Sequence, residues 1–89
     1  MTIIKFNNEY AYRTAFTRTV FYAVENELFI QDINKDAGRM YNKEMGIMIS
    51  VLHPHKFIKI EGNDPKKINS LESEILKIKE KEDFPKKEK

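Results

Sequence analysis

The stretch Gly46–Glu61, GIMISVLHPHKFIKIE, decides the fold, because it is the longest apolar and β-branched run in the chain. His53-Pro54-His55 interrupts this run once, and a proline among polar residues is typical of a turn. On both sides of the turn apolar residues fill alternate positions, which is the pattern of a β-strand. We therefore predict two adjacent strands that form the middle of a small sheet.

The first of these central strands is apolar on both faces. Three residues share one face and three the other, in the alternating order Ile47, Met48, Ile49, Ser50, Val51, Leu52. A strand with two apolar faces is normally covered on both. We expect a C-terminal helix on one side, and the opposite wall of a curled sheet or another protein chain on the other.

The last third of the chain predicts that helix. Asp64 is a suitable N-cap, and Pro65 suits the first helical position. Four apolar residues follow at helical spacing and form one stripe, namely Ile68, Leu71, Ile75 and Ile78. We predict an amphipathic helix over residues 64–83, a single domain over residues 1–84 and a charged, solvated tail over residues 85–89.

The segment Glu9–Val24 fits two periodicities. A period of 3.6 predicts a helix with Asn8 as its N-cap, and a period of two predicts a strand. Its threonines, valine and aromatic residues favour a strand from about Arg13 to Val24, with the helix left open. Further short strands are predicted at Thr2–Phe6, Leu28–Ile33 and Arg39–Tyr41.

Together these elements predict an α+β fold. It consists of a small, curled, antiparallel sheet of about five strands, within residues 2–61, followed by one C-terminal amphipathic helix. A chain of 89 residues buries a modest core, so small domains of this size often gain burial by association. Homo-oligomerisation is therefore one expectation.

The composition limits the kinds of partner and the cellular location that we expect for this protein. The net charge is only +2, so no strongly basic or acidic surface is expected from the totals. Cysteine is absent, which excludes disulfides and thiolate chemistry and fits a reducing cytoplasm. The chain shows no secretory signal pattern and no apolar run long enough for a membrane span. We expect a cytoplasmic protein without a membrane partner.

The sequence carries no recognisable catalytic pattern. His53 and His55 are the only imidazoles, whereas a catalytic zinc site needs three protein ligands and a structural site four. We interpret them as two exposed side chains of a proline turn. No nucleophile motif or glycine-rich phosphate loop is present. We predict no metal, no cofactor and no enzymatic activity.

The preferred hypothesis is a non-catalytic binding module or inhibitor that occupies a surface of a larger protein partner. Small chains of similar size and composition are found in phages and mobile elements as inhibitors of host machinery, which by analogy suggests a viral origin and the host cytoplasm. Aromatic residues, methionine and arginine are enriched in interface cores. The predicted anchors are Tyr22, Arg39, Met40, Tyr41 and Met45.

Two alternatives remain. On a strand, the aromatic and basic residues of the N-terminal third would form a surface that stacks bases and meets phosphates of single-stranded nucleic acid. These residues are Tyr10, Tyr12, Arg13, Phe16 and Arg18. The other alternative is an oligomer that sequesters a small ligand between protomers, with His53, Arg39 and Tyr41 as the contacting residues.

Overall fold

The computed structural model describes residues 2–31 and 33–82, so the predicted tail lies outside the described residues. The elements are, in order, β1 (Thr2–Lys5), α1 (Glu9–Glu25), β2 (Phe29–Gln31), β3 (Ala37–Asn42), β4 (Ile47–Leu52), β5 (Phe57–Gly62) and α2 (Pro65–Glu82). The antiparallel sheet of five strands, the two central strands and the C-terminal helix are confirmed. Within the described ranges, no helix combines the length and apolar character that crossing a membrane requires.

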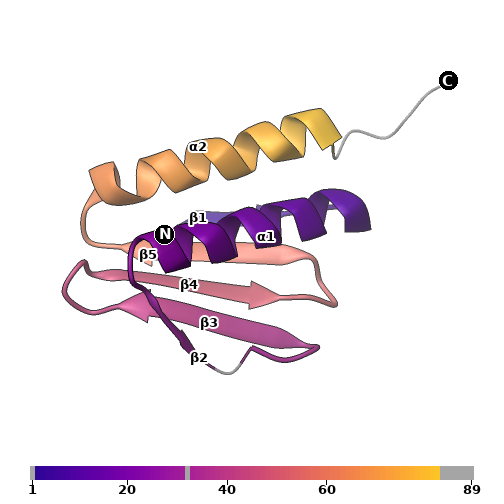
Figure 1. Cartoon of the computed structure of the whole chain (residues 1–89). Helices are drawn as coiled ribbons and strands as arrows, with labels where there is room; N and C mark the ends of the chain where they lie inside the picture. The colour runs from indigo at the N-terminus through magenta and orange to yellow at the C-terminus, as the bar shows by residue number, and fades with distance from the viewer. Residues whose placement is uncertain (1, 32, 83–89) are drawn as a thin grey trace, which may run out of the picture.

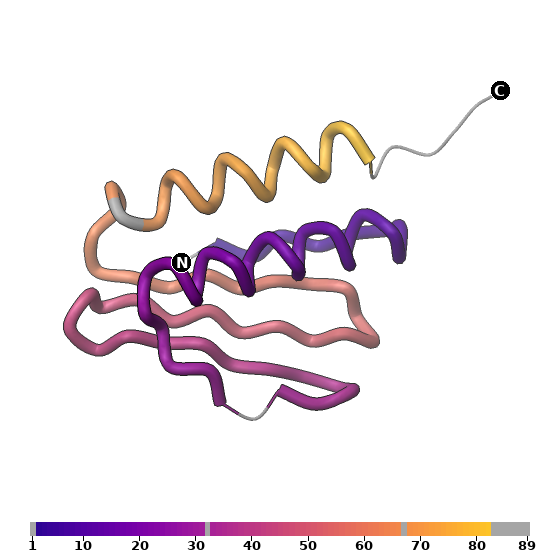
Figure 2. Tube along the Cα trace, viewed as in Figure 1, coloured from indigo at the N-terminus to yellow at the C-terminus, as the bar shows by residue number. Residues whose placement is uncertain are grey.

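The strands are arranged in the order β1-β5-β4-β3-β2, and every neighbouring pair is antiparallel. Helix α1 connects β1 at one edge with β2 at the other edge. Both helices lie side by side on one face of the sheet, which gives two layers (Figure 1). Figure 2 shows the same path as a tube, with α1 running back across the sheet after β1.

The prediction of a strand over about Arg13–Val24 is wrong, because this segment belongs to α1. Asn8 caps the helix: its Oδ1 accepts hydrogen bonds from the backbone N–H groups of Tyr10 (2.8 Å) and Ala11 (3.2 Å). The buried residues recur at spacings of one, three and four: Ala11, Tyr12, Ala15, Thr19 and Ala23. The cap and this stripe outweigh the strand propensity of threonine and aromatic residues.

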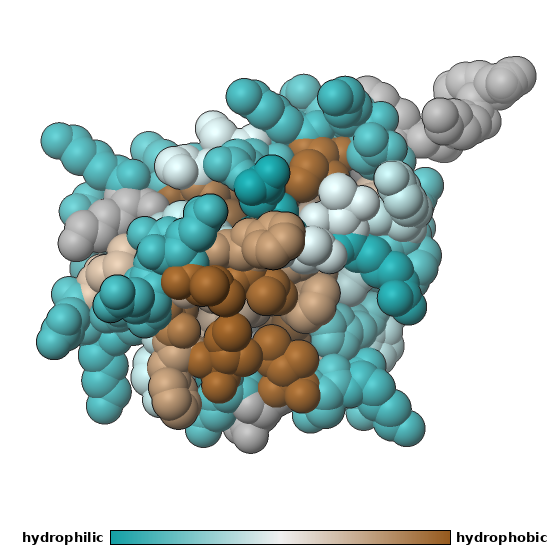
Figure 3. Space-filling model, in the orientation of Figure 1, coloured by the Kyte–Doolittle hydropathy of each residue, from teal (hydrophilic) through white to brown (hydrophobic). Residues whose placement is uncertain are grey.

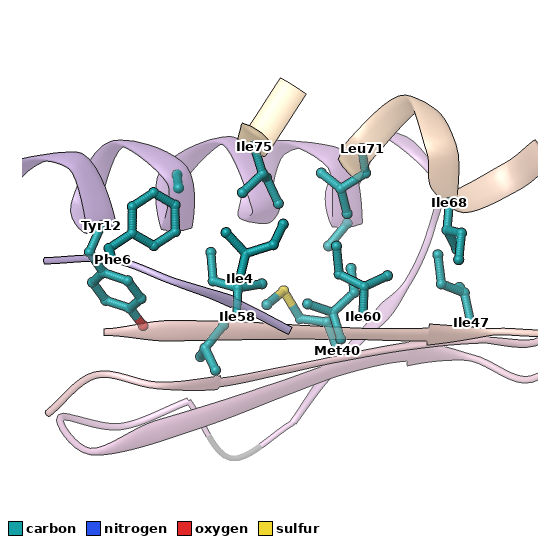
Figure 4. Close-up of a cluster of buried hydrophobic side chains, with 14 of the residues drawn as sticks. Ile4, Phe6, Tyr12, Met40, Ile47, Ile58, Ile60, Ile68, Leu71 and Ile75 are labelled. Atoms are coloured by element: carbon teal, nitrogen blue, oxygen red, sulfur yellow. The ribbon is translucent and has the colours of Figure 1, made fainter. Parts of the chain in front are cut away.

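The hydrophobic core fills the space between the helices and the sheet (Figure 4). Met40, Ile49 and Ile60 face each other across β3, β4 and β5 and are fully buried. From α2, the predicted stripe contributes Ile68, Leu71 and Ile75 to the same core. Burial of this apolar surface is the main term that stabilises the fold.

The opposite face of the sheet, here called the outer face, has no described helix over it (Figure 1). In β4 the side chains of Ile47, Ile49 and Val51 point to the core, and those between them point outward. Met48 on the outer face is 37 % exposed. A single sheet provides no opposite wall, so the expected second cover does not come from the described residues.

Candidate binding surfaces

The turn between β4 and β5 is held against α1 by an aromatic cluster. Nδ1 of His53 lies 2.6 Å from the hydroxyl of Tyr12. The His53 ring also packs edge-on against the ring of Phe16, with 4.9 Å between centroids. The histidine–proline turn is confirmed, but His53 is half-buried rather than exposed as expected. Within residues 2–31 and 33–82, no group of three His, Cys, Asp or Glu side chains is arranged to hold a metal ion.

The environment of Tyr12 gives it a structural role. Burial, with a smaller contribution from the negative charge of Glu9, raises the pKa of the Tyr12 phenol to about 12. The hydroxyl therefore stays protonated at neutral pH. It links helix α1 to the turn after β4 instead of exchanging protons in that range.

The structure does not form the predicted nucleic-acid surface at the N-terminal third. Tyr12 is buried, whereas Tyr10 is 64 % exposed on a different side of α1. The two cations are paired with carboxylates: Arg13 with Glu9 at 2.8 Å and Arg18 with Glu74 at 3.2 Å. The helical geometry thus separates rings and cations that a strand would have placed together.

The predicted partner anchors are also dispersed. Met40 is 0 % exposed in the core, so its predicted contact with a partner is wrong. Tyr22 lies on α1 and is partly buried, and burial raises the pKa of its phenol. Met45 lies in the β3–β4 loop against the core. Only Arg39 and Tyr41 share a surface, since both point to the outer face from β3.

The same dispersion applies to the proposed ligand-sequestering set. His53 is held in the β4–β5 turn by Tyr12, whereas Arg39 and Tyr41 lie on the outer face of β3. The structure therefore brings together two of these three residues.

One apolar surface extends from α1 to the strand at the sheet edge. We call it the apolar patch; it consists of Val20, Val24, Ile30 and Ile33. Val20 and Val24 are one helical turn apart. Helix α2 packs over β5 and β1 and contacts α1 from that side, so the helix layer leaves β2 at the far edge partly uncovered. Figure 3 shows this apolar area between α1 and the lower edge of the sheet.

The exposed fractions of the patch residues are high for aliphatic side chains. Val24 is 62 % exposed, Ile30 41 % and Ile33 39 %. Ile30 is paired with Met40 and therefore lies on the helix side of the sheet. Contiguous exposed apolar residues on a small domain are typical of an interaction site.

The outer face is chemically different, because its residues form three cross-strand rows. The register places them as follows: Phe29, Tyr41, Met48 and Glu61 in the first row; Gln31, Arg39, Ser50, Lys59 and Ile3 in the second; Ala37, Leu52, Phe57 and Lys5 in the third. A row with two cations thus runs between two rows that carry aromatic rings. This face mixes charge with exposed apolar surface.

Neither surface was identified from the sequence. The alternation in Phe29–Gln31 and in Arg39–Tyr41 is visible there, but the register between strands is needed before their side chains can be assigned to common rows. The apolar patch joins residues of a helix and of a strand, so no single periodicity reveals it. The exposed side chain of Val24 near the end of α1 indicates a surface site only once the segment is known to be helical.

No known family model, curated protein or solved structure matches this chain.

Proposed function

We propose that the chain is a non-catalytic binding module that occupies a surface of a larger protein. The observation that supports this function is the apolar patch on α1 and β2. Val20, Val24 and Ile30 are held on α1 and β2, and Ile33 follows β2 in the chain, so little conformational entropy is lost when a partner covers the three residues on regular elements. An inhibitor of a larger assembly is the specific form of this function that we favour.

The position of the patch at a sheet edge supports the same function. β2 is the last strand of the sheet and pairs only with β3 among the described strands. An edge strand presents backbone N–H and C=O groups to an added strand. A partner with an extended apolar segment would pair with β2 and bury the patch at the same time.

A pull-down from lysate of the natural host cells tests this function. The substitutions Val24→Glu and Ile30→Glu place a charge inside the apolar patch, and each should abolish capture of the partner. Leu76→Glu is the matched control, because Leu76 is 45 % exposed on α2, away from the patch. Circular dichroism would show that all three variants remain folded.

Light scattering separates a partner from self-association. Under our proposal the purified wild-type chain is monomeric and forms a complex of defined stoichiometry with the captured protein. A wild-type dimer that Ile30→Glu dissociates would show instead that a second copy covers the patch. Equal capture by all variants would contradict the proposal.

A further inference from the structure

We propose that the outer face of the sheet is a second binding site, which takes single-stranded nucleic acid. The site lies on the side of the sheet opposite the helices, whereas the apolar patch lies on the helix side. The inference therefore does not depend on the proposed protein partner.

The middle row of the outer face supplies the contacts for phosphate. Arg39 and Lys59 flank Ser50 directly across β3, β4 and β5. A guanidinium, a hydroxyl and an ammonium in one line can meet successive phosphate oxygens of a bound strand. The side chain of Arg39 makes no ion pair or hydrogen bond with the described residues, so it can bind phosphate without breaking an internal contact.

The charge of this face has the sign that phosphate requires. Its outward-pointing residues include three cations, Lys5, Arg39 and Lys59, against the one carboxylate of Glu61. That excess of two charges equals the net charge of the entire chain, +2. Lys59 and Glu61 lie 3.4 Å apart, and both are partly exposed, so water screens this pair and a phosphate can compete for the lysine.

The rows on either side supply rings for the bases. Tyr41 packs edge-on against Phe29, with 5.4 Å between centroids and 63° between planes. Phe57 lies in the third row, beyond the cations. Base–aromatic stacking tolerates any sequence, because every base has a π-face. The two rows are therefore suited to bases of different identity.

The spacing of the rings indicates how a strand would lie. With ~3.4 Å per residue and ~4.8 Å between strands, Tyr41 and Phe57 are roughly 17 Å apart. Adjacent stacked bases are only ~3.4 Å apart. The two rings thus contact separate nucleotides of one extended strand, whose intervening phosphates pass over Arg39 and Lys59.

The shape of the face agrees with this path. Two open hollows border Arg39, one of about 440 Å³ that includes Tyr41 and Met48 and one of about 380 Å³ that includes Phe57 and Lys59. Each hollow contains one of the two rings. Among the described elements, no helix or ribbon that could enter the major groove of a duplex projects from this face (Figure 1). Single strands, whose bases are accessible, fit it better.

The charged middle row also distinguishes this face from a protein interface. The cores of protein–protein interfaces are depleted in lysine, aspartate and glutamate, and the middle row contains Lys59. Here Arg39 and Lys59 lie in the middle row, and the rings of Tyr41 and Phe57 lie in the rows on either side. Nucleic-acid interfaces are polar and positively charged, which is the arrangement on the outer face.

Fluorescence anisotropy with a labelled oligothymidylate or oligouridylate of about 15 nucleotides tests the inference. We expect binding at about 50 mM salt that weakens steeply towards about 200 mM. Arg39→Ala and Lys59→Ala should each reduce the slope of log Kd against log salt by about one. Tyr41→Ala should weaken binding by roughly fivefold to a hundredfold.

Matched controls come from the helix layer. Tyr10→Ala removes an exposed ring from α1, and Lys66→Ala removes an exposed cation from α2; neither should change binding. Val24→Glu should also leave it unchanged, which separates this site from the apolar patch. Because Tyr41 is half-buried, Arg39→Glu provides a variant of an exposed side chain that keeps the fold and should abolish binding.

The absence of binding at about 50 mM salt would overturn the inference, because phosphate contacts are strongest at low ionic strength. Binding that Arg39→Glu and Tyr41→Ala leave intact would overturn it as well. A duplex of the same length that binds as tightly as the single strand would show that only charge is recognised, and would contradict the role assigned to the rings.

Discussion

The hydroxyl of Tyr12 lies 2.6 Å from Nδ1 of His53 and ties α1 to the turn between β4 and β5. The two residues are 41 positions apart in sequence. Phe16 and Phe6 pack their rings around the same tyrosine. This contact fixes one end of the helix over the sheet.

Tyr12→Phe removes this hydrogen bond and keeps the ring in the core. We expect a loss of about 1–3 kcal/mol in the free energy of unfolding, because Nδ1 of the half-buried His53 is left without its partner. Urea denaturation would measure it. Tyr10→Phe, at a position 64 % exposed, should change stability little. Equal effects of both substitutions would show that the hydrogen bond contributes nothing.

The raised pKa of Tyr12 predicts a loss of stability at high pH. The phenol ionises near pH 10.0 in the unfolded chain and near pH 12 in the folded one. Between these values the folded state binds more protons than the unfolded state, so the stabilising contribution is complete below about pH 10 and is lost as the pH rises towards about 12. Tyr12→Phe should therefore lose less stability over this window, as measured by urea denaturation at each pH. Parallel pH profiles of the two proteins would contradict the prediction.

Asn8→Ala removes the side-chain oxygen that caps α1. We expect destabilisation of about 1 kcal/mol, since the N–H groups of Tyr10 and Ala11 lose their acceptor. Asn8→Asp retains an acceptor and adds a negative charge at the helix N-terminus, so it should keep the wild-type midpoint of thermal unfolding. A similar loss of stability in Asn8→Asp would show that the side-chain cap is not the cause.

Thr19 is 0 % exposed, and its hydroxyl donates a hydrogen bond of 2.8 Å to the carbonyl oxygen of Ala15. That carbonyl already accepts the regular helical hydrogen bond. Thr19→Val should therefore be neutral or stabilising by up to about 1 kcal/mol, whereas Thr19→Ala should be destabilising because it leaves a cavity. Chemical denaturation of the wild-type protein and the two variants measures the order of their stabilities. If Thr19→Val is less stable than Thr19→Ala, the prediction is wrong.

The parts of the fold that sequence predicted correctly are those with one dominant local signal. Asp64 and Pro65 place the start of α2, and its apolar stripe has one period. The strands on either side of the His53–Lys56 turn alternate without ambiguity. Glu9–Val24 satisfied both periods, and the alanines at 11, 15 and 23, which allow α1 to approach the core, were the signal that favoured the helix.

The candidate sites could be predicted less well, because they depend on which face each strand residue takes. Met40 and its neighbours Arg39 and Tyr41 necessarily point to opposite faces. The pairing of Met40 with Ile49 decides that the methionine is inside. This pairing depends on the register of the β3–β4 hairpin, which the alternation within either strand alone does not fix. The registers of the other strand pairs assemble the rows of the outer face in the same way.

The crossover of α1 from one edge of the sheet to the other has a consequence for the order of folding. Among the described strands, β1 pairs only with β5, the last strand in sequence, whereas β2 pairs with the strand that follows it, β3. During synthesis β1 therefore leaves the ribosome well before its partner β5. Strands β2, β3, β4 and β5 each pair with a sequence neighbour and can assemble first, and they provide the template on which β1 adds to the edge of the sheet.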